Sequence, residues 1–406
     1  MRVYPRHHLD LTAGHLVYAA LACCRPADGE RLGRSILAHG RRADGVVCFS
    51  VRSGFDLLLD ALELPRGSEI VVTAITHPDM VRIIGSHGLR PVPVDICYAT
   101  LAPRLDIVEA AITGRTRAIL VAHLFGSRFD VGPVAEIARR HGVLLLEDCA
   151  QSLRGPSDSG HPGADVAMFS FGSIKTCPAL GGAICYVRDD SVRARMDVIQ
   201  SEWPRQSRLA YLKRVVWFMG LLALGRPAIF GAFARATAFV GADVEQLVNA
   251  CVHAVRPPSA ADQDGFSAWL RRRPSLPMLA LLEQRLRRFD DERLRLRAQR
   301  GEELRLRLPA ASTPGHAADV RTHWVFPVLV DEPAELTRVL RRQGFDATSR
   351  TTSIAAVDGC DGSRAGTAQE LMARVVFVPA YPELPRRARE RLAAALEAYL
   401  DGNGAR

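Results

Sequence analysis

Residues Val143 to Gly182 read VLLLEDCAQSLRGPSDSGHPGADVAMFSFGSIKTCPALGG, and this stretch decides the fold. It contains two apolar runs that end in polar residues, the first in Glu147-Asp148 and the second in Ser170. Gly181-Gly182 then open a third apolar run. Short apolar runs between turn residues are typical of buried strands, and open α/β sheets bind ligands at the carboxyl ends of their strands. The stretch therefore predicts three strands with a ligand site at their ends.

The pattern of short apolar runs continues toward the amino terminus. Apolar runs that predict strands alternate with segments of helical spacing, at 46–52, 55–64, 69–72, 80–87, 90–94, 105–112, 118–122 and 131–140. Strands that alternate with helices of about ten residues indicate a mostly parallel sheet that helices cover on both faces. The sequence therefore predicts an α/β domain.

After residue 200 the regular alternation of predicted strands and helices ends. A charged helical region covers 276–308, and predicted strands at 325–330 and 375–378 alternate with helices in what we expect to be a smaller α+β domain. We expect four parts in all. They are an N-terminal arm (1–45), a large domain (46–200), a helical insertion (201–266), and a connector helix with a small C-terminal domain (267–406).

The predicted insertion contains an uncharged run, VVWFMGLLALG, at 215–225. We expect it to pack on the core or on a second subunit. Because Lys213, Arg214 and Arg226 flank a Trp/Phe/Leu face, the segment 211–241 also fits a helix that lies on a membrane surface. No apolar run reaches the roughly 18 residues that a transmembrane helix needs. The first residues, MRVYPRHHLD, lack the apolar core of a signal peptide, so we expect a cytoplasmic protein.

Composition argues against several classes of function. The chain has 406 residues, of which 48% are hydrophobic and 24% charged, as in ordinary globular proteins. Its net charge of +9 comes from arginine, because Lys175 and Lys213 are the only lysines. No basic patch is interleaved with aromatic residues, so we expect no nucleic-acid partner. The nine cysteines include no C-x-x-C pair, and we expect neither a disulfide framework nor a metal site.

The scarcity of lysine draws attention to Lys175. In a chain that uses arginine almost everywhere, a retained lysine indicates a task that arginine cannot perform, and forming an imine is such a task. Lys175 follows the second apolar run in the turn SFGSIKT, where burial would lower its pKa and free its lone pair. We therefore predict that Lys175 is the Schiff-base lysine of a pyridoxal phosphate (PLP) enzyme.

PLP needs further partners, and the central stretch offers them. Asp148 is placed to face the pyridine nitrogen, where a charge pair is worth on the order of 4 kcal/mol at an effective dielectric near 20. Asp148 could instead cap a helix. Gln151 could hydrogen-bond the ring hydroxyl.

The phosphate and the ring face have weaker candidates. Ser53-Gly54, predicted to precede a helix, could bind the phosphate with free N–H groups, and Ser170 could add a hydroxyl. The loop residue His77 could stack on the ring, although a loop histidine is more often solvated or a helix cap.

The order of these motifs resembles the DegT-type sugar aminotransferases, which are PLP enzymes of fold type I. The resemblance is carried by Ser53-Gly54, His123-Leu-Phe-Gly126, Glu147-Asp-Cys-Ala-Gln151, Ser170-Phe171, Lys175, Gly181-Gly182, His323-Trp-Val-Phe-Pro327 and Val378-Pro379-Ala-Tyr-Pro382. It implies a large domain with a mostly parallel, seven-stranded-type sheet and a smaller C-terminal α+β domain.

The resemblance also implies a reaction. An amino group would pass from glutamate or glutamine to a keto sugar, typically carried on a nucleotide, with Lys175 forming the Schiff base and moving protons. The same resemblance places Asp148 at the pyridine nitrogen, Gln151 near the ring hydroxyl, and Ser170 with Ser53-Gly54 on the phosphate. It implies a homodimer with active sites at the subunit interface.

Three departures from the family pattern leave alternatives open. Phe55 follows Gly54 where the family has threonine, Leu180 replaces an acidic residue, and the Asn-x-Arg segment is unrecognisable around Arg273-Pro-Ser275. The alternatives are a non-catalytic or regulatory protein of this fold and a PLP enzyme of another reaction type, such as a sugar dehydratase. The resemblance would place a histidine at the lysine position of a dehydratase, so Lys175 argues against that reaction.

Overall fold

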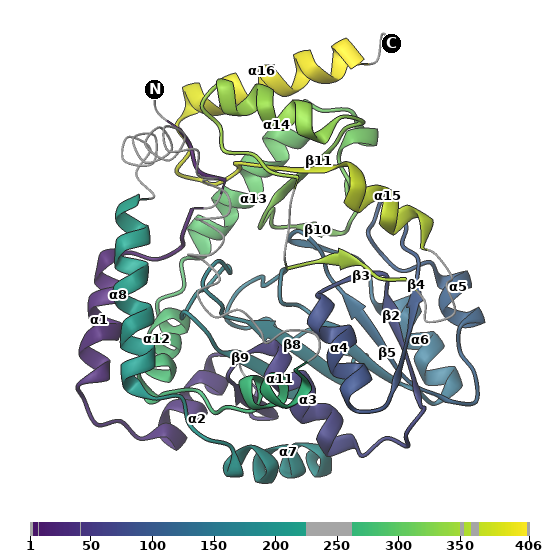
Figure 1. Cartoon of the computed structure of the whole chain (residues 1–406), viewed down its shortest axis with the longest axis vertical. Coiled ribbons are helices and arrows are strands. Elements are labelled where there is room, and N and C mark those ends of the chain that lie inside the picture. The colour runs from purple at the N-terminus through teal and green to yellow at the C-terminus, as the bar shows by residue number, and fades with distance from the viewer. Residues whose placement is uncertain are drawn as a thin grey trace.

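The computed structural model describes residues 3–6, 8–40, 42–224, 262–349, 353–358 and 365–403. Its centre is a seven-stranded sheet in the order β1-β9-β8-β7-β5-β2-β4 (Figure 1). The strands are β1 (Gly45–Cys48), β2 (Glu69–Thr73), β4 (Arg90–Val94), β5 (Thr116–Ala122), β7 (Leu144–Asp148), β8 (Val166–Ser170) and β9 (Ala183–Val187). Only β9 runs against its neighbours in this sheet. The mostly parallel seven-stranded sheet is thus confirmed.

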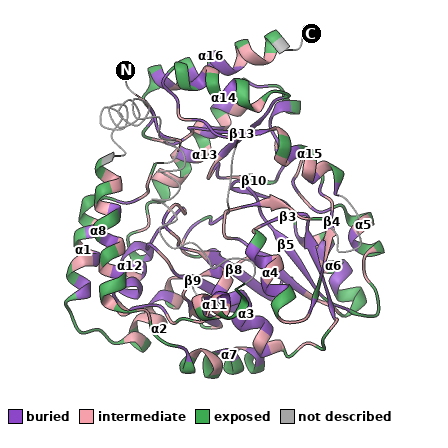
Figure 2. Ribbon diagram, viewed as in Figure 1, coloured by how far each residue is buried: buried purple, intermediate pink, exposed green. Residues whose placement is uncertain are grey.

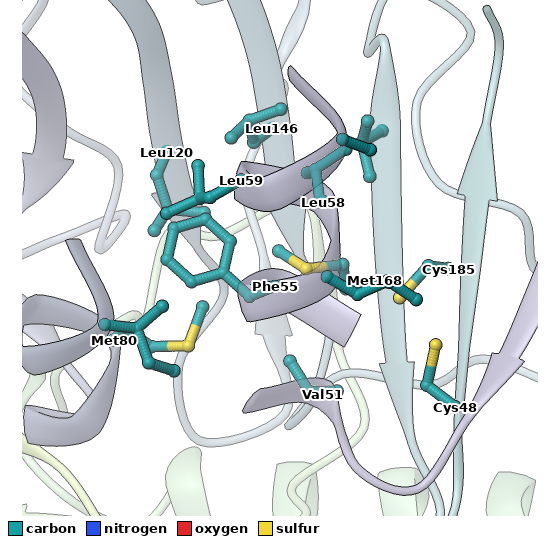
Figure 3. Close-up of a cluster of buried hydrophobic side chains, with 14 of the residues drawn as sticks. Cys48, Val51, Phe55, Leu58, Leu59, Met80, Leu120, Leu146, Met168 and Cys185 are labelled. Atoms are coloured by element: carbon teal, nitrogen blue, oxygen red, sulfur yellow. The ribbon is translucent and has the colours of Figure 1, made fainter. Parts of the chain in front are cut away.

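Helices cover both faces of the sheet, because successive side chains of a strand point to opposite sides. Leu120 and Leu146 face a cluster shared with α3, α4 and α7, whereas Ile119 and Leu145 face α5 and α6. Figure 3 shows Phe55 of α3 pointing into the first cluster beside Met80. These helices are α3 (Val51–Leu62), α4 (Pro78–Ser86), α5 (Leu105–Ala110), α6 (Gly132–His141) and α7 (Asp190–Glu202). In Figure 2 the strands are mostly buried and the outer helices expose one side.

A layer of four helices covers the β8-β9 end of the sheet. They are α1 (Ala13–Cys23), α2 (Gly29–His39), α8 (Arg208–Leu224) and α12 (Leu276–Arg287). α8 contributes Tyr211, Val215 and Phe218 to a buried cluster with α1 and α12. α2 was not expected, because its sequence GERLGRSILAH is polar and only Ile36 among its residues is buried. The expected packing of the insertion on the core is seen for α8, while residues 225–261 lie outside the described residues.

The membrane-surface interpretation of 211–241 stays a prediction. Its second half lies outside the described residues, and the first half buries Tyr211, Val215 and Phe218 in the protein. No helix among the described residues is long and apolar enough to cross a membrane.

The C-terminal part forms a smaller α+β unit around the antiparallel pair β11-β13 (Figure 1). Its elements are α13 (Asp291–Arg305), β10 (Val320–Arg321), β11 (Phe326–Leu329), α14 (Pro333–Arg342), β12 (Ala355–Ala356), α15 (Gly366–Arg374), β13 (Val375–Val378) and α16 (Arg386–Asn403). The charged helical region expected over 276–308 is two helices, because α12 ends at Arg287 and Asp290 caps α13. A short helix, α11 (Gln263–Leu270), precedes α12.

Two short antiparallel ladders join the C-terminal unit to the large domain. β10 pairs with β6 (Ser127–Arg128), and β12 pairs with β3 (Ile75–Thr76). Both β3 and β6 directly follow strands of the central sheet, at its carboxyl edge. The C-terminal unit is therefore held against the edge at which the sequence predicts the ligand site.

Candidate active site

Lys175 lies in a tight turn after β8. Its backbone N–H donates to Gly172 O at 3.0 Å, and Gly172 N–H donates to Ser170 Oγ at 3.4 Å. The ammonium Nζ stands 4.1 Å from the centroid of the Trp324 indole ring, whose Nε1 donates to Ile174 O at 2.7 Å. A tryptophan from the C-terminal part of the chain therefore fixes the turn and covers the lysine.

The surroundings make Lys175 unusually acidic. Burial lowers the pKa of Lys175 from 10.5 to about 8, while the carboxylate of Asp148 raises it and Arg52 lowers it. A lysine with a pKa of about 8 is neutral for roughly a tenth of the time at pH 7, hundreds of times more than an ordinary lysine. The neutral amine is the form that reacts with an aldehyde.

Asp148 ends β7 and lies within electrostatic reach of Lys175. In the sheet, its backbone lies beside Ala122 of β5 and Met168 of β8. The residue is 8% exposed, and its Oδ1 accepts a hydrogen bond from Ala150 N–H at 2.9 Å. The alternative of a helix cap is wrong, because a turn and not a helix follows. Burial raises the pKa of Asp148, whereas the Ala150 hydrogen bond and the charge of Lys175 lower it.

Glu147 points away from this site into a separate ionic network. It accepts a hydrogen bond from His161 N–H at 2.6 Å and pairs with His123 at 2.8 Å and Arg128 at 3.3 Å. Burial opposes ionisation, but His123 and Arg128 hold the pKa of Glu147 at about 2. His123, Glu147 and Cys149 lie close enough together to hold a metal ion. Both oxygens of Glu147, however, already have hydrogen-bond partners within the protein. Asp148 is therefore the better of the two carboxylates for a cofactor.

Gln151 lies just beyond Asp148, half-buried in the following turn. Its Oε1 accepts the backbone N–H of Phe125 at 2.9 Å, and Phe125 is held at a positive φ of 59°. Because the oxygen is occupied, the side-chain amide group is left as the hydrogen-bond donor, as a bond to a ring hydroxyl oxygen requires.

The prediction that Ser53-Gly54 precedes a helix is wrong. α3 begins at Val51, and its cap is Ser50, whose Oγ accepts Ser53 N–H at 3.1 Å. Gly54 N–H donates to Ser50 O at 2.9 Å, so neither N–H is free for a phosphate. Gly54 instead allows α3 to approach the sheet, because a Cβ there would stand 2.4 Å from Cys185 Sγ.

The start of α3 nevertheless lies at the carboxyl edge of the sheet, where the ligand site is predicted. Cys48 at the end of β1 and Ser170 at the end of β8 both pair with Ala183 of β9. The two strand ends are therefore two strand spacings apart, about 10 Å. The first N–H groups of α3, at Val51 and Arg52, have no acceptor within the helix. These two residues, and not Ser53-Gly54, carry the N–H groups that an anion could use.

His77 caps α4. Its Nδ1 accepts Asp79 N–H at 3.1 Å, which is the helix-cap alternative considered from the sequence. Stacking of His77 on a cofactor ring stays a prediction.

Sequence reasoning gave no role at this site to three residues. Trp324 covers Lys175. Arg52, two residues after the helix cap, contacts Asp79 at 2.6 Å and lies 4.5 Å from the Trp269 ring centroid. Arg214 of α8 donates through Nη2 to Ser173 Oγ at 2.7 Å, two residues before Lys175. Arg214 was noticed only as the flank of an apolar run, because nothing in a sequence shows to which side of a helix such a residue turns.

Two of the three departures from the family pattern place hydrophobic side chains in the core. Phe55 is fully buried under α3, and Leu180 is 2% exposed in the cluster beneath α8 and α12. Leu180 also adopts a positive φ of 59°, which is uncommon outside glycine. Both positions therefore contribute to the hydrophobic core.

A small polar cavity borders Lys175 and Trp324, against the C-terminal unit. Its volume is about 30 Å³, enough for one or two water molecules. It is lined by Arg6, His8, Asp10, Ile174, Lys175, Arg293, Arg297, Trp324, Val325, Val378, Ala380 and Tyr381. In this conformation the cavity does not have room for a sugar.

Residues 30–214 match the sequence profile of the DegT/DnrJ/EryC1/StrS aminotransferase family. Over 153 residues the chain is 36% identical to the dTDP-3-amino-3,4,6-trideoxy-alpha-D-glucose transaminase of Micromonospora megalomicea subsp. nigra, covering 36% of this chain and 41% of that protein. Over 174 residues it is 32% identical to the "Pleiotropic regulatory protein" of Geobacillus stearothermophilus, covering 42% and 47% respectively. The matches thus span less than half the length of these relatives.

Solved structures of similar fold cover nearly the whole chain. The aminotransferase TlmJ from Streptoalloteichus hindustanus matches with a TM-score of 0.69 and 18% identity over 99% of both chains. A Streptococcus pneumoniae protein assigned as a sugar aminotransferase, in its PLP-form, matches with a TM-score of 0.70 and 15% identity over 98% of both chains. The fold predicted from the sequence is thereby confirmed.

Proposed function

We propose, because residues 30–214 match the sequence profile of the DegT/DnrJ/EryC1/StrS aminotransferase family, that this protein is a PLP-dependent aminotransferase acting on a keto sugar. The single observation that supports this most is the pairing of Lys175, with its pKa lowered to about 8, and the buried carboxylate of Asp148. PLP holds a substrate amine as an imine and withdraws electrons from the carbon next to it. The residues present fit that cofactor, because Lys175 offers a reactive amine and Asp148 offers a carboxylate that is buried away from water.

The residues would divide the work as follows. The amine of Lys175 would hold the cofactor and, once released by the substrate, carry a proton between substrate carbon and cofactor carbon. Asp148 would keep the ring nitrogen protonated, and the amide group of Gln151 would donate to the ring hydroxyl oxygen. Ser170 would contribute its hydroxyl to the phosphate, and His77 would cover the ring. Both backbone N–H groups of Ser53 and Gly54 have acceptors, so only the Ser53 hydroxyl is left as a phosphate contact. That hydroxyl is buried and shares a hydrogen bond of 2.9 Å with the Ser50 hydroxyl.

The finer parts of the proposal come from the family. We infer that the amino donor is glutamate or glutamine, that the acceptor sugar is linked to a nucleotide, and that the protein works as a cytoplasmic homodimer with shared active sites. Sedimentation equilibrium of the purified protein tests the dimer, and a monomer mass at micromolar concentration would contradict it.

The central experiment uses the two lysines of the chain. Protein purified with PLP should show the visible absorption band of lysine-bound cofactor, Lys175→Ala should lack it, and the matched control Lys213→Ala should retain it. Adding glutamate or glutamine should shift the band to the amine form of the cofactor. A nucleotide-linked keto sugar should then restore it, and the aminated sugar can be identified by mass spectrometry. Absence of the band in the unaltered protein would contradict the proposal.

A second candidate is a regulatory protein of the same fold. It is supported by the name of the Geobacillus relative and by the strained, buried Leu180 in place of an acidic residue. A band that forms with PLP but does not respond to any amino donor would favour this candidate over transamination.

A further inference from the structure

Arg214 turns toward the protein interior from the buried side of α8. The preceding turn of α8 carries Tyr211, which is fully buried and donates its hydroxyl to Ala179 O at 2.9 Å. The following turn carries Phe218, also fully buried. Arg214 lies between them and reaches Ser173 Oγ at 2.7 Å. Exposed residues of the helix, such as Leu209, lie on its other side.

The guanidinium of Arg214 is short of partners. Its Nε is buried and has no hydrogen-bond acceptor, and no carboxylate pairs with Arg214 among the described parts of the chain. Burial lowers the pKa of Arg214, and the nearby positive charge of Arg52 lowers it further. The side chain is partly buried, and it contacts the Ser173 hydroxyl and the Phe218 ring, whose centroid lies 5.7 Å from the guanidinium carbon. A cation largely removed from water without a carboxylate partner is costly unless an anion completes the site.

The groups around Arg214 favour an anion. Ser173 lies two residues from Lys175, and Arg52 acts electrostatically on both Lys175 and Arg214. Arg52 stands in the first turn of α3, at a helix terminus whose dipole also favours negative charge. Asp79 of α4 forms an ion pair with Arg52. It therefore offsets the charge of Arg52, while Arg214 has no carboxylate partner of its own within the ranges that the structure describes. A phosphate dianion matches the donors and the charge that remain.

We propose that Arg214, with Ser173 and the amino terminus of α3, forms the site that binds the phosphate of the cofactor. This inference rests on the proposed PLP function. Arg214 belongs to the same chain as Lys175, so this one contact to the phosphate is made within a single subunit. Ser173 holds the guanidinium in place through one nitrogen, and the unpartnered Nε is available to the anion.

The test compares PLP with pyridoxal, which lacks the phosphate. Apo-protein is titrated with each while the lysine-bound band is followed, using Arg214→Met, Arg214→Lys and the neighbouring control Lys213→Met. Losing a charge-assisted bond to phosphate should weaken PLP binding about tenfold to a hundredfold in Arg214→Met. Pyridoxal binding should stay unchanged, Arg214→Lys should fall between, and Lys213→Met should match the unaltered protein. Equal effects on PLP and pyridoxal, or none on either, would overturn the proposal.

A second measurement covers the case in which Arg214→Met fails to fold. In the unaltered protein, inorganic phosphate should compete with PLP and leave pyridoxal binding intact, and competition with both or with neither would overturn the proposal. Phosphate binding is also measured directly by calorimetry on the apo-protein and on Arg214→Lys. Phosphate binding that depends on Arg214 in a protein that forms no band with PLP would contradict the proposed function, and would assign the site to another phosphate ligand.

Discussion

At the scale of single residues, the chemistry of Lys175 is set by three neighbours. Burial under Trp324 lowers its pKa, Asp148 opposes this, and Arg52 adds to it. The lysine is therefore mostly protonated below about pH 8 and mostly neutral above it. Cofactor capture should follow this titration.

The two-lysine composition allows this pKa to be measured directly. In Lys213→Arg protein labelled with ¹³C-lysine, a single side-chain signal should titrate with a midpoint near 8. Asp148→Asn should move the midpoint down, since its carboxylate raises the pKa, and Arg52→Met should move it up. A midpoint near 10.5 in the apo-protein would contradict the buried environment.

Asp148 should matter for turnover more than for stability. In Asp148→Asn the charge pair with the ring nitrogen is lost, which at roughly 4 kcal/mol corresponds to about a thousandfold slower conversion of the bound cofactor by glutamate. Single-turnover absorbance measures the rate, and the exposed Asp190→Asn serves as control. A loss below about tenfold would argue against Asp148 as the ring partner.

At the scale of elements, the start of α3 decides which groups reach the site. The sequence pattern placed the helix about four residues too late, because Val51 and the apolar residues before it read as one continuous strand. The Ser50 cap, a local hydrogen bond, overrides that pattern. The strands of the sheet were predictable because their apolar runs are long and regular, whereas α2 buries only Ile36 and left little signal.

Two glycines test how closely α3 packs on the sheet. Gly54→Ala should destabilise the protein by about 1–3 kcal/mol, because the added Cβ would meet Cys185 Sγ at 2.4 Å. Gly85→Ala in α4 is the matched change, since nothing lies within 4 Å of its Cβ position, and it should stabilise by up to about 1 kcal/mol. Urea unfolding of both variants measures the difference, and equal midpoints would contradict the packing.

At the scale of the whole molecule, the site is assembled from parts far apart in the chain. Asp148 and Lys175 lie in the stretch that predicted the fold, so a sequence motif could identify them. Trp324 and Arg214 arrive from the C-terminal unit and from α8, and only the folded chain shows that they meet Lys175 and Ser173. Motif spacing therefore identified Lys175 and Asp148 as candidates but did not assign the residues that surround them.

Trp324 gives a test of this assembly. In Trp324→Ala water should reach Lys175, and its pKa should rise from about 8 toward 10.5. Loss of the cation–π contact acts in the opposite direction but is worth only about 1–2 kcal/mol. At pH 8 cofactor capture should therefore slow about tenfold. Stopped-flow absorbance measures the rate of cofactor capture. If both Trp324→Ala and Trp324→Phe capture the cofactor at the rate of the unaltered protein, the indole does not shield the lysine.

The two short ladders β10-β6 and β12-β3 have a consequence for how ligands enter. They fasten the C-terminal unit to the rim of the sheet at two separate places. A hinged, flap-like opening would have to rupture both sets of backbone hydrogen bonds, at a net cost of about 1 kcal/mol for each bond. Opening of the unit is therefore opposed at both places, which favours entry of substrate and exit of product beside the unit.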